Sequence, residues 1–228
     1  MNRRRALAGT CALAACPALR AAGVRLQPVA LSLAPGETSG TVWIDNPGPQ
    51  RLDIRAGMFA WSQVAGDERL EPTGEMAVSP ARADVPAGGR QRLRVVLLKP
   101  PGDDRERSYR LIVDERQEAS EAVAARYSLP VFVQADEGAP VQLAASVAEL
   151  DGATTRLRID NPSRRHARLV DLGYRAPDGT LRLLAPDLAG YVLPGGHKHW
   201  TLPGPVAQFR SGAFEATVNG RPTRLAVE

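Results

Sequence analysis

One short segment occurs twice in this chain, and it restricts the fold more than any other feature. Residues 41–47 read TVWIDNP, and about half the chain later residues 156–162 read RLRIDNP. In both copies an apolar run ends in an Asn-Pro turn, and a second apolar run follows after a few polar residues. Solenoid repeats recur every 20 to 50 residues or so. A repeat at this larger spacing therefore indicates two related domains.

The pattern around the repeat predicts β-strands. Short runs of Val, Leu, Ile and aromatic residues alternate with Gly, Pro, Asn and Asp, and the chain holds 19 prolines and 21 glycines. Helical periodicity is weak throughout, so we expect an all-β fold of sandwiches. The polar stretch at residues 136–140 (DEGAP) predicts a short, stiff linker. We expect domains at residues 23–135 and 141–228.

The N-terminus has the features of an export signal. Arg3, Arg4 and Arg5 precede a small apolar run that is shorter than the roughly 20 apolar residues of a membrane-spanning helix. We expect cleavage after Ala22, a mature protein outside the cytoplasm without membrane insertion, and export by either the general or the twin-arginine route. Residues 13–16 (LAAC) also match a lipoprotein processing box with Cys16 as the acylated residue.

Removing residues 1–22 changes the charge and the cysteine count. Both cysteines lie there, together with four arginines and no acids. Taking these four from the 29 basic side chains leaves 25, against 25 acidic side chains. A mature chain without net charge implies no nucleic-acid partner, and its stability must come from packing without disulfides.

Residues 123–133 carry the clearest functional signal, because apolar residues alternate along a strand longer than the usual 5 or 6 residues. One interpretation is an ordinary core strand. The other is an edge strand that donates its apolar face to another protein's incomplete sandwich. Pro130 cannot donate to a ladder, so one side of the strand must be unpaired or bulged there. The apolar face comprises Val123, Ala125, Tyr127, Leu129, Val131 and Val133.

The order of motifs along the chain resembles the PapD-like periplasmic chaperones of chaperone–usher pili. The matching segments are residues 34–37, 44–47, 59–61, 78–80, 85–89, 105–111, 128–133, 158–162 and 219–222. The resemblance implies two immunoglobulin-like β-sandwich domains in an L-shaped arrangement. It also implies a non-enzymatic protein without a cofactor.

The same resemblance implies roles for particular residues. Val123, Ala125, Tyr127 and Leu129 would fill the groove of a pilus subunit by donor-strand complementation, and an outer-membrane usher would then receive the subunit. Glu106 falls at the acidic position that fixes the angle between the two domains. A self-capping homodimer is a further expectation for a chain with such a strand.

Three positions depart from the family pattern. The family grips the subunit's C-terminal carboxylate with two basic residues, but Ala30 and Pro130 stand at those places. Arg25 and Arg126 are the nearest substitutes on the same strands, several residues away. Three alternatives stay open: one or both arginines act as the carboxylate anchor, the register is locally different, or the subunit docks in another way. The basic partner of the interdomain glutamate is replaced by Gln134.

Other residue clusters give weaker signals of chemistry. His197 and His199 lie on one strand face and could bind zinc or copper, but a turn with polar tips is the preferred interpretation and no metal is expected. Ser163 lies close to His166 without an oxyanion signature. The carboxylates of Glu68 and Glu71 read as a solvated hairpin tip. The alternative to a chaperone is a structural or adhesive surface protein with two immunoglobulin-like domains, lipid-anchored at Cys16.

Overall fold

The computed structural model of the chain describes residues 24–100, 102, 104–116, 122–135 and 140–227. The expected export signal, including Cys16, and most of the expected linker lie outside the described residues. Within these ranges the regular structure consists of strands and one short 3₁₀ helix, η1 (Val206–Phe209). The described ranges contain no helix long and apolar enough to cross a membrane.

The strands form two sandwiches, one before and one after the break near residue 140. The first contains β1 (Arg25–Gln27), β2 (Leu31–Leu33), β3 (Ser39–Asp45), β4 (Leu52–Val64), β5 (Asp67–Pro72), β6 (Met76–Ser79), β7 (Arg82–Val85), β8 (Arg90–Leu97), β9 (Arg107–Arg116) and β10 (Val123–Val133). The second contains β11 (Ala144–Asp151), β12 (Thr154–Asp160), β13 (Ala167–Arg175), β14 (Leu181–Val192), β15 (His197–Pro203), β16 (Ala213–Val218) and β17 (Arg221–Ala226).

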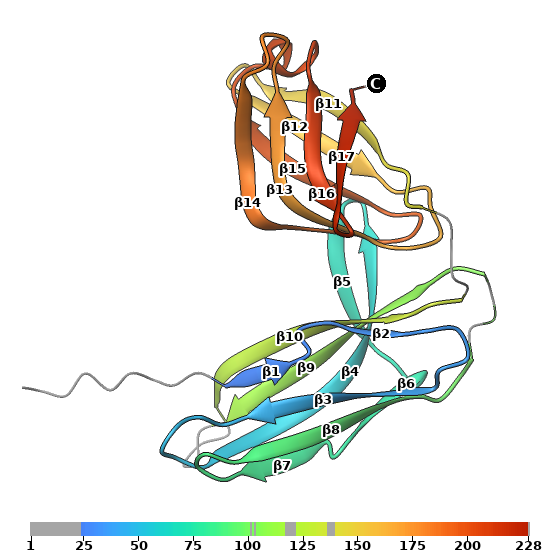
Figure 1. Cartoon of the computed structure of the whole chain (residues 1–228), viewed down its shortest axis with the longest axis vertical. Coiled ribbons are helices and arrows are strands. Elements are labelled where there is room, and N and C mark those ends of the chain that lie inside the picture. Colours follow the sequence, from blue (N-terminus) through green and yellow to red (C-terminus); the bar gives the residue numbers. More distant parts are fainter. Residues whose placement is uncertain (1–23, 101, 103, 117–121, 136–139, 228) are drawn as a thin grey trace, which may run out of the picture.

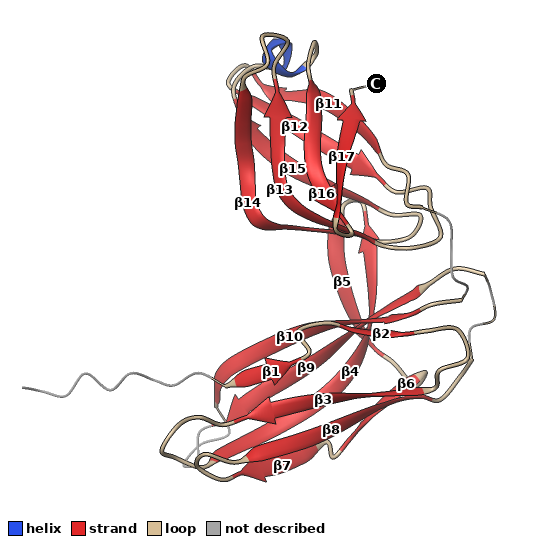
Figure 2. Cartoon of the chain, viewed as in Figure 1, coloured by secondary structure: helices blue, strands red, loops and turns tan. Residues whose placement is uncertain are grey.

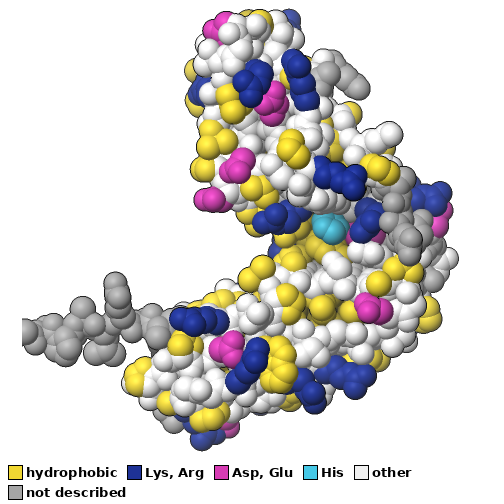
Figure 3. All heavy atoms as spheres, in the orientation of Figure 1, with side chains coloured by type: hydrophobic (Ala, Val, Ile, Leu, Met, Phe, Trp, Pro, Cys, Tyr) yellow, Lys and Arg dark blue, Asp and Glu magenta, His cyan; other side chains and the backbone are white. Residues whose placement is uncertain are grey.

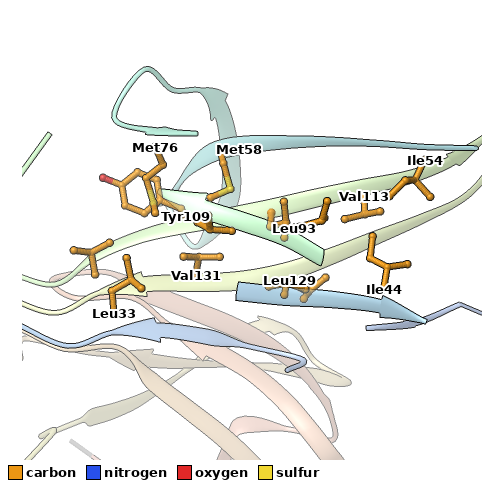
Figure 4. Packing of buried hydrophobic residues seen from close by; sticks show 14 of the residues in the cluster. Leu33, Ile44, Ile54, Met58, Met76, Leu93, Tyr109, Val113, Leu129 and Val131 are labelled. Carbon is orange, nitrogen blue, oxygen red and sulfur yellow. The ribbon is translucent and has the colours of Figure 1, made fainter. Parts of the chain in front are cut away.

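The first sandwich packs a sheet in the order β1-β3-β8-β6 against a sheet in the order β2-β10-β9-β4-β5, with β7 also paired to β4. Alternate residues of each strand point inward because side chains on a strand alternate between its faces. Figure 4 shows these inward side chains meeting between the sheets, among them Ile44 of β3, Leu93 of β8 and Val131 of β10. All three are fully buried.

The second sandwich packs the sheet β11-β12-β15 against the sheet β14-β13-β16-β17. Its core is more aromatic than the first, with Tyr174, Phe209 and Phe214 in mutual contact at centroid distances of 5.1 to 6.2 Å. In the described ranges, four sheets and no helical layer give an all-β molecule (Figure 2).

The repeated Asn-Pro segment has one structural explanation in both sandwiches. Asn46 and Asn161 follow the ends of β3 and β12, and both are buried. In each copy the side-chain amide donates to the carbonyl four residues later, at 2.7 Å from Asn46 and 2.8 Å from Asn161. In each copy the side-chain oxygen also accepts from the amide two residues later, at 3.0 Å. A buried asparagine that satisfies a tight corner explains why the sequence recurs.

The two sandwiches are set at an angle, and the hairpin of β4 and β5 reaches from the first to the second (Figure 1). Gln63 near the end of β4 donates to the carbonyl of Tyr191 at 2.8 Å and accepts from the amide of Leu193 at 2.9 Å. The predicted fold of two immunoglobulin-like sandwiches in an L-shaped arrangement is confirmed.

Candidate functional site

Strand β10 has one open edge. On one side it pairs with β9 from Val123 to Val133, with one irregularity near Val123. On the other side β2 runs parallel to it and pairs only with Val131, Phe132 and Val133. Along residues 123–130 the second edge therefore has no strand partner among the described residues. Unpaired main-chain groups of this kind are able to accept an added strand.

The core-facing side of β10 passes gradually from buried to exposed. Val131 and Leu129 are buried, with Leu129 3% exposed. Tyr127 is half-buried and packs against the same core, and Val123 at the far end is 42% exposed. Burial, followed by the nearby Glu115 carboxylate, raises the pKa of Tyr127.

The four expected donor side chains therefore share a face but not an environment. Val123, Ala125 and Tyr127 are partly or largely accessible, whereas Leu129 belongs to the core of the chain's own first sandwich. The alternation that the sequence shows continues without a break from one environment to the other. Sequence periodicity alone could not separate the two groups.

The opposite face of β10 carries Arg126, which is held by Asp114 of β9. Its Nε and Nη2 atoms donate to the two carboxylate oxygens at 2.7 and 2.9 Å. The Arg126 hydrogen bonds lower the pKa of Asp114. Beside this pair lies an apolar cavity of about 440 Å³ on the outer face of the sheet. Its lining includes Gly57, Phe59 and Ile112.

The two arginines expected to anchor a carboxylate do not form one site. Arg126 is 62% exposed on the outer face of the β10 sheet. Arg25 is exposed on β1, opposite Asp45 of β3, in the other sheet of the sandwich. The faces of stacked sheets lie about 10 Å apart and these two side chains point away from each other. Ala30 and Pro130 immediately precede the first pair of the β2–β10 ladder, Leu31 and Val131.

The second sandwich contacts the first through a histidine and a glutamate. Glu106 has a fully buried side chain, and its Oε1 accepts from the amide of His166 at 3.0 Å and lies 2.7 Å from Nδ1 of the same residue. The imidazole ring stacks on Phe132 of β10 at a centroid distance of 3.5 Å. Trp61 and Tyr191 complete this aromatic cluster. Figure 3 shows the molecule hollowed between the sandwiches, with apolar side chains in the hollow.

Sequence reasoning missed the contact between His166 and Phe132, which joins the two sandwiches. The sequence has Gln134 where the family has the basic partner of Glu106, and in the structure Glu106 instead contacts His166 of the second sandwich, 60 residues along the chain. One signal was present in the sequence, since Phe132 is the only large apolar residue on the outward face of an otherwise polar stretch. An outward aromatic of this kind indicates a covered surface.

The residues considered for catalysis or metal binding make the following contacts in the structure. The rings of His197 and His199 lie 5.0 Å apart, while the nearby Asp160 is bound by Arg158 at 2.8 Å. Among the described residues no group of three metal-ligating side chains converges. Ser163 bonds the main chain of Gln142. Glu68 pairs with Arg110 and Lys198, each at 3.3 Å, where the hairpin meets the second sandwich.

Comparison with known proteins gives consistent results. A family model described as "Pili and flagellar-assembly chaperone, PapD N-terminal domain" matches residues 23–137. A chain in the crystal structure of the CsuC–CsuE chaperone–tip adhesion subunit pre-assembly complex, from archaic chaperone-usher Csu pili of Acinetobacter baumannii, is similar with a TM-score of 0.74 and 22% identity. The similarity covers 91% of this chain and 100% of that one.

Two further structures show the same fold. The chaperone DraB of E. coli has a TM-score of 0.64 at 14% identity, over 90% of this chain and 97% of that chain. The Salmonella enterica SafA pilin in complex with the SafB chaperone gives 0.60 at 15% identity, over 89% and 92%. No curated protein sequence matches the chain.

Proposed function

Because this chain belongs to the PapD-like family of pili and flagellar-assembly chaperones, it is a pilus assembly chaperone, and we propose that it works by lending strand β10 to a subunit. The open edge of β10 supports this mechanism. A strand of the subunit would pair with residues 123–130, and the main-chain hydrogen bonds of a new ladder would hold it.

The graded burial of β10 supports a particular arrangement of side chains. Val123, Ala125 and Tyr127 would enter the apolar groove of a subunit that lacks a strand. Leu129 would lie at the boundary, where the core of the chaperone meets the core of the subunit. Burying these side chains would stabilise the complex at about 25 cal/mol per Å² of apolar surface removed from water.

The partners follow from the same proposal. Two of the similar structures contain a chaperone together with a tip adhesion subunit or a pilin, and we infer a pilus subunit as the client here. The chaperone would act in the periplasm and pass the subunit to an outer-membrane usher. The subunit's remaining folding free energy would drive the handover, so no nucleotide and no catalytic step are required. Without a client, two copies could cap each other's open edges.

The alternative of a structural or adhesive surface protein is not favoured. The family match covers the sandwich that carries β10, and its description names chaperones. Lipid attachment at Cys16 concerns a residue outside the described part of the chain. Intact-mass measurement of the mature protein would decide it, with a start at Gly23 and no lipid as the expected result.

The donor role is tested by placing a charge at its most informative position. Tyr127→Glu should abolish capture of a co-expressed pilus subunit, because an unpaired carboxylate in the subunit's groove costs several kcal/mol. The variant should stay folded, since Tyr127 is only half-buried. Pull-down and circular dichroism melting measure the two properties.

Leu183→Glu is the matched control, because Leu183 is 52% exposed on the second sandwich, away from β10. It introduces the same charge and should leave capture unchanged. A folded Tyr127→Glu variant that still binds the subunit would contradict the donor role.

A further inference from the structure

The outward face of the β1-β3-β8-β6 sheet carries a row of arginines that the proposed function does not use. Arg90, Arg92 and Arg94 occupy alternate positions of β8 and are exposed, while Leu93 and Val95 between and beside them are buried in the core. The alternation fixes all three guanidinium groups on the outward side. Successive arginines are therefore spaced by about 6.6 Å along the strand.

The neighbouring strands add to this face, which we call the arginine face. Trp43 lies opposite Arg92, and Asp45 lies opposite Arg90. Arg25 of β1 lies on the other side of Asp45. The charged residues at the outward positions of the four strands are thus four arginines and one aspartate.

The one aspartate is already engaged. Nε of Arg90 lies 2.9 Å from Oδ1 of Asp45, and the Arg90 guanidinium also stacks over the ring of Trp43 at 4.2 Å. Arg94 donates to the hydroxyl of Ser39 at 3.2 Å and has Thr41 and Ser79 opposite it. No acidic side chain lies opposite Arg92 or Arg94 in the described ladders of this sheet.

The row of like charges on this face is unfavourable while no partner neutralises it. Like charges side by side on a sheet repel one another, and the chain beyond residue 22 has as many acids as bases, so this local excess is not a general property of the molecule. Arginine and tryptophan are also the side chains that contribute most strongly to protein interfaces. The half-buried Trp43 lies in the middle of the row.

We propose that the arginine face binds an acidic, extended segment of a partner protein. Carboxylates on alternate residues of an extended chain have the same spacing as Arg90, Arg92 and Arg94, and guanidinium groups bind carboxylates in a bidentate geometry. Trp43 supplies an apolar anchor within the row. The face belongs to the sheet that does not contain β10, so the chaperone can bind this segment while β10 holds a subunit.

The test uses a synthetic peptide of alternating Thr and Glu, with the matching Thr and Gln peptide as the uncharged probe. Full-length mature protein should bind the acidic peptide, with an affinity that falls as salt rises. The double variant Arg92→Gln/Arg94→Gln should weaken the affinity by about tenfold. Arg90 is left intact because it bonds Asp45.

The matched control is Arg168→Gln/Arg210→Gln, which removes two exposed arginines from the second sandwich and should bind as the wild type does. Circular dichroism should show that neither variant melts below the wild type, since all four side chains are exposed. Equal loss in the two double variants would overturn the proposal, and so would equal binding of the two peptides. Binding only to vesicles containing phosphatidylglycerol would also overturn it and assign the face to a lipid surface.

Discussion

The inner half of strand β10 (residues 129–133) and its outer half (residues 123–128) show the same apolar alternation but have different structural neighbours. Residues 129–133 are buried, and the last three of them pair with β2 as well as with β9. Phe132 also stacks on His166 of the second sandwich. Residues 123–128 have one open edge and partly exposed apolar side chains. The difference shows that the neighbouring strand, and not the apolar alternation of β10 itself, decides which part of its edge is open to a partner.

That neighbour is short because the chain divides its first strand between the two sheets. Residues 25–27 pair with β3 in one sheet, and residues 31–33 pair with β10 in the other. Pro28 lies in the crossing and has no amide hydrogen for a ladder. Neither part of this divided segment pairs with residues 123–130 of β10.

The largest effect on the free energy of unfolding is expected from a substitution in the inner half of β10. Leu129→Glu buries an unpaired carboxylate in the core of the first sandwich and should lower the free energy of unfolding by more than about 4 kcal/mol. Urea titration followed by circular dichroism measures it. Val123→Glu, at the exposed end of the same face, should unfold as the wild type does. Equal stability of the two variants would remove the distinction between the halves.

An intermediate effect on the free energy of unfolding is expected from a substitution where the inner half of β10 meets the second sandwich. Phe132→Ala removes a ring that is buried between His166 and Trp61, and should cost about 3 kcal/mol. Loss of the stack should also widen the distribution of angles between the sandwiches, measured as an increased radius of gyration by small-angle X-ray scattering. An unchanged radius would mean that the hydrogen bonds of Glu106 and Gln63 hold the angle alone.

The smallest effect is expected on the outer half, at Arg126. The pKa of Asp114 is lowered by its hydrogen bonds with Arg126, so this pair stabilises the fold above the ordinary aspartate pKa of about 3.9 and stops doing so as the pH falls through the lower folded value. Acidification through that range should therefore destabilise the wild type slightly more than Arg126→Ala, as measured by urea titration at several pH values.

The same variant addresses the carboxylate anchor. Since Arg126 is engaged by both oxygens of Asp114, Arg126→Ala should capture a subunit nearly as well as the wild type at neutral pH. A large loss of capture would instead mean that Arg126 leaves Asp114 to bind the subunit's carboxylate.

The sequence predicted the architecture because its determinants are local. The corners at Asn46 and Asn161 depend on hydrogen bonds to residues two and four positions away, and strand alternation is visible residue by residue. The burial of Leu129 was not predictable in this way, since it depends on where β2 begins. The contact of Glu106 with His166 was missed because it joins residues that only the packing of two sandwiches brings together.

Strand β4 has a mechanical consequence. It is one continuous strand of 13 residues, with Ile54 in the first core and Gln63 bonded to the second sandwich. No loop interrupts the strand between Leu52 and Val64. β4 therefore connects the core of the first sandwich directly to the second sandwich. We therefore expect a change of twist in the sheet that β4 shares with β9 and β10 to change the tilt of the second sandwich.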